Sequence, residues 1–194
     1  PPTGRIDKEL SPEQTGWNGI QGRMRRAGGI SPDMKIDDVL PNFPDEAVKI
    51  IMAHQKTNPL MLYLAYPAPH TPWLPSKEFL GKSKVGIYGD FVMMVDAQVG
   101  KVLTALKQAN MDKDTLVIFT SDNGPCWFEK DVTKYGHDSQ GGLRGMKADA
   151  WEAGHRMPFV ARWPGVTKPS STSKQLICFT DFLATFADIM GCLL

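Results

Sequence analysis

Two short apolar runs, separated by one long amphipathic stretch, constrain the fold of this chain more than any other feature. The first run is PLMLYLAY (residues 59–66), and the second is TLVIFT (115–120). Between them, residues 88–110 place apolar side chains at the three-to-four spacing of a helix. Near-continuous apolar runs are typical of strands that are covered on both faces. The order therefore predicts a right-handed crossover between two parallel strands of one sheet.

Four other segments complete the predicted architecture. The stretch DEAVKIIMAHQ, which begins at Asp45, combines apolar residues at helical spacing with acids in its first turn, and predicts a helix. MPFVARWP (157–164) predicts a third strand, and TDFLATFADIM (180–190), opened by a threonine cap, predicts a closing helix. Residues 1–44 are polar and rich in Gly, Pro and Arg, so we expect irregular, loop-rich structure there. We expect an α/β fold, a mainly parallel sheet flanked by helices, with its core in residues 45–194.

Composition and charge exclude several classes of partner. The chain has 22 Lys and Arg against 21 Asp and Glu, so its charge predicts neither nucleic-acid nor anionic membrane binding. No run approaches the ~18 apolar residues of a transmembrane helix. Three cysteines at unrelated spacings, Cys126, Cys178 and Cys192, predict neither a disulfide framework nor a zinc site. Partners are expected at local sites, and the sequence leaves the oligomeric state open.

Each of the two central apolar runs ends in a polar cluster. PAPHTPW follows the first run, and SDNGP follows the second. Ligands of open parallel sheets gather beyond the carboxyl ends of the strands, so we expect His70 and Asp122 at the same edge of the sheet. A tight turn is the alternative explanation for Asp122, Asn123 and Gly124, because all three residue types favour reversals after a strand.

These clusters contain residues suited to catalysis. Asp122 and Asn123 supply carboxylate and amide oxygens, which suit Ca²⁺ or Mg²⁺, but two adjacent ligands cannot satisfy an ion that takes six or more oxygens. His70 lies between Pro69 and Pro72 and can exchange a proton near neutral pH. Its alternative role is that of a structural hydrogen-bond partner.

A third polar segment, GGLRGMKADAWEAGHR (141–156), leads into the last predicted strand. Its glycines allow the backbone to approach a ligand closely, and Lys147 offers a compact cation for an oxyanion. An ordinary charged surface loop is the alternative interpretation.

Taken in order, three segments resemble the C-terminal portion of the sulfatase catalytic domain, within the alkaline-phosphatase-like superfamily. They are LMLYLAYPAPHTPW, TLVIFTSDNGP and GGLRGMKADAWEAGHRMPFVARWPG. The similarity extends from about residue 45 to the C-terminus. It implies a sulfuric ester hydrolase that uses a metal ion to hydrolyse a sulfate monoester of a small molecule or a saccharide. The family's members are mostly exported or lysosomal, so the resemblance implies a periplasmic, secreted or lysosomal location.

The resemblance also implies roles for individual residues. Asp122 and Asn123 match metal ligands that hold a divalent cation, usually calcium. His70 matches the histidine that protonates the leaving oxygen, and Lys147 matches the lysine that binds sulfate oxygens. His137 is expected only as a substrate contact. Such a set is chemically coherent, because sulfuryl transfer requires cations on the sulfate oxygens and a protonated leaving group.

Two parts of the family pattern are missing. Sulfatases use a formylglycine nucleophile made from the first residue of Cys/Ser-x-Pro-x-Arg, and no Cys or Ser here has Pro two and Arg four positions later. Asp37 and Asp38 follow the polar stretch SPDMKI and do not match the family's first metal-binding Asp pair. Residues 1–194 are thus expected to be a partial catalytic domain that is inactive alone. Two alternatives remain open: a phosphodiesterase or phosphonate hydrolase of the same superfamily, and a noncatalytic calcium-binding module.

Overall fold

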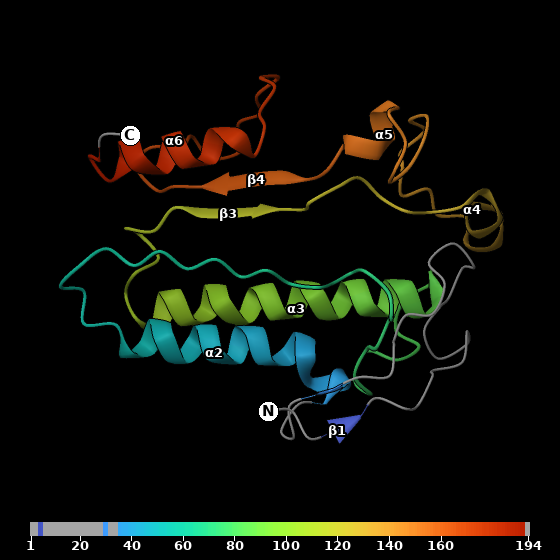
Figure 1. Ribbon diagram of the computed structural model, residues 1–194, viewed down its shortest axis with the longest axis horizontal. Coiled ribbons are helices and arrows are strands. Elements are labelled where there is room, and N and C mark those ends of the chain that lie inside the picture. Colours follow the sequence, from blue (N-terminus) through green and yellow to red (C-terminus); the bar gives the residue numbers. More distant parts are fainter. Residues whose placement is uncertain (1–3, 6–28, 31–34, 193–194) are drawn as a thin grey trace.

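The computed structural model describes residues 4–5, 29–30 and 35–192. Most of the segment predicted as irregular loop, 1–44, lies outside these residues, and its described end, residues 36–44, is helical rather than irregular. The elements in chain order are β1 (Gly4–Arg5), β2 (Gly29–Ile30), the 3₁₀ helix η1 (Ile36–Asp38), α2 (Val39–Ala53), α3 (Gly86–Gln108), β3 (Val117–Thr120), α4 (Glu129–Tyr135), α5 (Glu152–His155), β4 (Phe159–Arg162) and α6 (Thr180–Ile189). Figure 1 shows α2 and α3 side by side, with β3, β4 and α6 on the opposite side of α3 from α2. Among the described residues, no helix is long and apolar enough to cross a membrane.

The packing of α2 against α3 forms most of the core. One buried cluster joins Ile51 of α2 to Ala105 and Leu106 of α3. A second joins Leu40 to Phe91, Met94 and Val95. Full burial of such a side chain contributes about 1.5–3 kcal/mol each. The predicted amphipathic helix is confirmed, with its apolar stripe facing α2.

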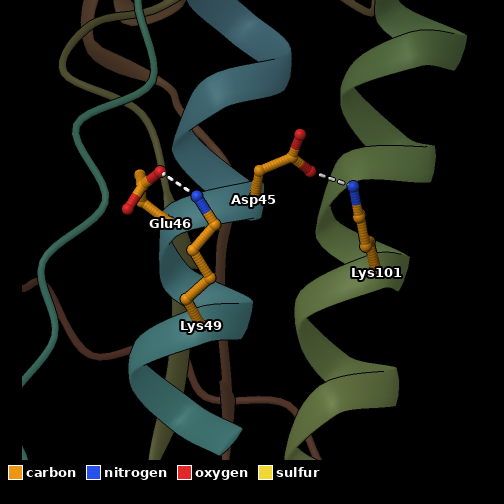
Figure 2. A network of polar contacts seen from close by, with 4 residues as sticks. All are labelled: Asp45, Glu46, Lys49 and Lys101. Carbon is orange, nitrogen blue, oxygen red and sulfur yellow. Dashed lines mark hydrogen bonds and ion pairs between the residues drawn. The ribbon is translucent and has the colours of Figure 1, made fainter. Parts of the chain in front are cut away.

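Two ion pairs lie on the surface of this helix pair (Figure 2). The Asp45 carboxylate of α2 accepts a hydrogen bond from the Lys101 ammonium of α3, and Glu46 pairs with Lys49 within α2 at 2.6 Å. All four side chains are exposed to solvent. Exposed pairs of this kind contribute about 0–1 kcal/mol each. The apolar clusters, rather than the ion pairs, hold α2 on α3.

Helix α2 begins at Val39, earlier than the start predicted at Asp45. Proline lacks the N–H for an intrahelical bond and is unfavourable inside a helix. In the structure Pro44 lies inside α2 and is fully buried, so packing overrides its low helix propensity. The apolar residues predicted to form the buried face of α2 do so only in part, since Ile51 is buried whereas Ile50 is 44% exposed.

The first apolar run is extended but is not paired as a strand in the structure. Its side chains alternate: Leu62 and Tyr66 pack on the two core clusters, whereas Met61 and Tyr63 are 64% and 83% exposed. Figure 1 shows this segment, in teal, running along α3. Residues 59–66 are therefore covered on one face, not on both faces as predicted.

The second and third predicted strands are present as β3 and β4, and they pair antiparallel. Val117 lies opposite Arg162, and Thr120 lies opposite Phe159. The predicted mainly parallel sheet is not confirmed, because the pairings within the described ranges are antiparallel. Helix α6 packs on β4, with the rings of Phe182 and Phe159 6.0 Å apart. Helix α6 begins at Thr180, and Phe179 occupies the cap position without a side-chain hydrogen bond. The predicted threonine cap is therefore wrong.

Candidate active site

The loop that follows β3 is joined to the segment 141–156 by backbone hydrogen bonds. The N–H of Gly124 donates to the carbonyl of Gly154 at 3.0 Å, and the N–H of Lys147 donates to the carbonyl of Pro125 at 2.7 Å. A Cβ atom on Gly124 would lie 1.8 Å from the carbonyl oxygen of Ala153. Only glycine permits this approach. The structure thus brings two of the three sequence motifs into direct contact.

Asp122 and Asn123 lie just beyond the carboxyl end of β3, as their position in the sequence predicts. Asp122 is exposed, and its Oδ1 accepts a long hydrogen bond of 3.4 Å from Ser121 Oγ. The Nδ2 group of Asn123 donates to the carbonyl of Gly124 at 2.8 Å, so its amide oxygen faces away from that carbonyl. The two oxygens suit a hard cation such as Ca²⁺. No group of three or more His, Cys, Asp or Glu side chains gathers among the described residues.

Lys147 lies half-buried against the same loop. Burial raises the pKa of the Cys126 thiol, and the positive charge of Lys147 opposes part of that rise. The backbone hydrogen bond from the N–H of Lys147 to the carbonyl of Pro125, three residues after Asp122, places Lys147 beside the loop after β3.

His70 lies exposed in the loop that follows the extended segment 59–66. The peptide bonds before Pro69 and Pro72 are both cis. Nδ1 of His70 lies 2.7 Å from the carbonyl oxygen of Thr71, which is buried. A carbonyl oxygen only accepts hydrogen bonds, so Nδ1 carries a proton.

A row of aromatic rings connects the His70 loop to the loop after β3. Trp73 lies 5.2 Å from Tyr88 of α3, and Tyr88 lies 4.6 Å from Trp127, as measured between ring centroids. Trp127 is 2% exposed and follows Pro125 by two residues. These rings are parts of the site that the sequence did not predict. The sequence pattern assigned Tyr88 only to the apolar stripe of the predicted helix. Its position at the start of α3, between two tryptophan rings, was not predicted.

His137 lies in the loop after α4, beside the same row of rings. Its carbonyl accepts a hydrogen bond of 2.8 Å from Nε1 of Trp127, and its Nε2 lies 3.1 Å from Oγ of Ser139. The imidazole meets the Trp127 ring edge to face at 5.9 Å. His137, predicted only as a substrate contact, therefore lies against Trp127, which belongs to the loop after β3.

Comparisons with known proteins show the family of the chain. The family model described as Sulfatase matches residues 19–192. An N-acetylgalactosamine-6-O-sulfatase of Bacteroides thetaiotaomicron is 34% identical, over 97% of this chain and 39% of its own length. The human steryl-sulfatase is 34% identical over 87% of the chain and 29% of its own length. The mouse N-acetylgalactosamine-6-sulfatase is 35% identical over 77% of the chain and 28% of its own length.

Solved structures show the same likeness in three dimensions. A Bacteroides thetaiotaomicron protein, described in work on glycosaminoglycan metabolism as a 6S-sulfatase, superposes on 90% of the chain with a TM-score of 0.79 and 33% identity. Ps i-CgsB, solved in complex with a neocarrahexaose, superposes on 94% with a TM-score of 0.71 and 27% identity. The chain spans about two fifths of the length of each of these structures. It belongs to the sulfatase family, as the match over most of its length shows.

Proposed function

We propose that this chain supplies part of the active site of a sulfatase that hydrolyses the 6-sulfate of N-acetylgalactosamine within a saccharide. The observation that carries the proposal is the backbone contact between Lys147 and the loop of Asp122 and Asn123, which gathers a cation and two metal-ligand candidates at one strand end. Two relatives named for this substrate, from Bacteroides thetaiotaomicron and mouse, support the choice of sugar.

In this proposal Lys147 binds the sulfate group. A sulfate ester carries its negative charge on the oxygens around sulfur, and that charge shifts toward the leaving oxygen during hydrolysis. A preplaced ammonium beside the sulfate oxygens neutralises their charge and so favours attack at sulfur. The hydrogen bond from Lys147 N–H to Pro125 fixes the backbone from which this ammonium extends.

Asp122 and Asn123 would hold a calcium ion as two members of a larger set of oxygen ligands. When bound, this ion supplies positive charge that neutralises the sulfate oxygens. The carboxylate of Asp122 contributes charge to the coordination shell, and the amide of Asn123 contributes a neutral oxygen. The other ligands are proposed to come from outside the described residues.

His70 is proposed to protonate the leaving oxygen. In the imidazolium form both ring nitrogens carry protons, and the proton on Nε2 passes to the sugar oxygen as its bond to sulfur breaks. The proton on Nδ1 stays in the hydrogen bond with the carbonyl of Thr71. That bond keeps the ring oriented while its charge changes.

The nucleophile is proposed to lie outside these residues. The sequence contains no Cys/Ser-x-Pro-x-Arg motif from which the family's formylglycine is made. The 194-residue chain is therefore proposed to be inactive by itself, and to become active only within a full-length protein that carries such a motif.

The proposed function is tested by measuring sulfate release from N-acetylgalactosamine 6-sulfate, with the corresponding 6-phosphate as a control. We expect the full-length protein to release sulfate and the isolated chain to release none. Lys147→Ala should lower kcat/KM of the full-length protein by about 10²–10³, the range seen when one oxyanion-binding group is removed. Lys147→Arg, which keeps the charge, is the matched variant and should lose less. Faster release of phosphate than of sulfate, or full activity of Lys147→Ala, would contradict the proposal.

A further inference from the structure

The loop that carries His137 is held in one conformation by hydrogen bonds at both of its ends. The Asp138 carboxylate accepts the N–H groups of Gln140 at 2.9 Å and of Gly142 at 2.6 Å. Trp127 Nε1 donates to the carbonyl of His137, and Nε2 of Gln140 donates to the carbonyl of Trp127. A loop fixed in this way does not need to be ordered when a ligand binds, which favours a recognition role.

The imidazole of His137 has one nitrogen engaged within the protein. Its Nε2 lies 3.1 Å from Oγ of Ser139, and its ring packs edge to face on the buried Trp127. The side chain is only half-buried. Among the described residues no hydrogen-bond partner is found for Nδ1. The ring is thus oriented by the protein while one polar atom remains available to a ligand.

The loop of His137 is joined to the loop that follows β3. Nε1 of Trp127 donates to the carbonyl of His137 at 2.8 Å, and Trp127 follows Pro125 by two residues. The carbonyl of Pro125 accepts the N–H of Lys147 at 2.7 Å. His137 and the proposed sulfate-binding lysine are therefore both anchored to residues 125–127.

The chemistry of the imidazole indicates what it recognises. A sulfate group is bound best by full positive charges, which Lys147 provides. A sugar hydroxyl is neutral and both donates and accepts, so it suits an imidazole nitrogen whose orientation is already set. We infer that His137 is a specificity-determining residue, whose Nδ1 hydrogen-bonds to a ring hydroxyl of the sulfated sugar. Ser139 and Trp127 act as positioning residues for it. This inference rests on the proposed function and adds to it the contact that selects the sugar.

The test compares N-acetylgalactosamine 6-sulfate with its 3-deoxy and 4-deoxy analogues as substrates of the full-length protein. We expect the wild type to prefer the parent over one analogue by about tenfold or more in kcat/KM, which corresponds to one hydrogen bond. The analogue that the wild type disfavours lacks the hydroxyl bound by His137. His137→Ala should lower kcat/KM for the parent by about the same factor and leave kcat/KM for that analogue unchanged, so that the preference disappears. Ser139→Ala should reduce the preference in part, and Ser139→Thr, which keeps the hydroxyl, should restore it.

The possible results separate the two proposals. Equal losses in His137→Ala for the parent and both analogues, or no loss for any, would overturn the role of His137 while leaving the sulfatase activity in place. A wild type that hydrolyses none of the three would overturn the proposed function, and the role of His137 with it. If His137→Ala fails to fold, His137→Phe, which keeps a ring against Trp127 without any nitrogen, decides the question by the same comparison.

Discussion

Gly124 is the residue at which two sequence motifs approach each other most closely. Its N–H donates to Gly154, and the space that a side chain would need is occupied by the carbonyl oxygen of Ala153, 1.8 Å from an ideal Cβ. The obstructing atom belongs to the backbone of α5, so it cannot turn aside as a flexible side chain would. Any larger residue must push the loop of Asp122 and Asn123 away from α5.

We expect Gly124→Ala to lower the free energy of unfolding by about 2–3 kcal/mol, because it overpacks a rigid contact. Gly100→Ala is the matched control. Gly100 lies on α3 with no atom within 4 Å of its ideal Cβ, so alanine there should raise stability by about 0.5–1 kcal/mol through helix propensity. Urea unfolding of both variants checks the pair. A Gly124→Ala protein as stable as the wild type would show that the loop and α5 are not in rigid contact.

At the scale of the element, α3 depends on one buried carboxylate near its start. Asp90 is 3% exposed, and its two oxygens accept the backbone N–H groups of Gly81 at 2.8 Å and of Ser83 at 2.7 Å. These bonds tie the preceding loop to the end of α3 where Tyr88 joins the row of aromatic rings. The carboxylate therefore helps to set the position of that end of the helix.

We expect Asp90→Ala to destabilise the protein by about 2 kcal/mol, because it leaves two backbone donors without their acceptor. Asp96→Ala, at an exposed position of the same helix, is the control and should change stability by less than about 0.5 kcal/mol. Thermal or urea unfolding distinguishes the two. Equal effects at Asp90 and Asp96 would mean that the loop before α3 is held by other contacts.

The sequence predicts long elements better than short ones. The 23-residue α3 has a stripe of apolar residues that specifies both its type and its buried face. The four-residue α5 has no such period, and it forms where backbone contacts with Gly124 hold it. The direction of β4 relative to β3 also escaped prediction, because an apolar pattern indicates a strand but not the neighbour with which it pairs.

At the scale of the whole molecule, the order of the motifs does not specify the contacts that connect them. The sequence predicted His70 and Asp122 at one edge of a sheet, whereas the backbone contact found at Pro125 joins Lys147 to the loop of Asp122. The row formed by Trp73, Tyr88 and Trp127 draws one ring from each of three distant segments. Contacts of this kind depend on tertiary packing, which residue spacing along one segment does not contain.

The central claim is that Asp122 and Asn123 hold a metal ion whose remaining ligands lie elsewhere in a sulfatase. Calorimetric titration with CaCl₂ tests it most directly, using the full-length protein, its Asp122→Ala variant and the 194-residue chain. Calcium affinity rises with the number and charge of preplaced oxygens, so the chain alone should bind no tighter than ~10⁻³ M, and the full-length protein should bind more tightly. Asp122→Ala should abolish the tight binding. Unchanged affinity in that variant, or micromolar binding by the isolated chain, would contradict the account.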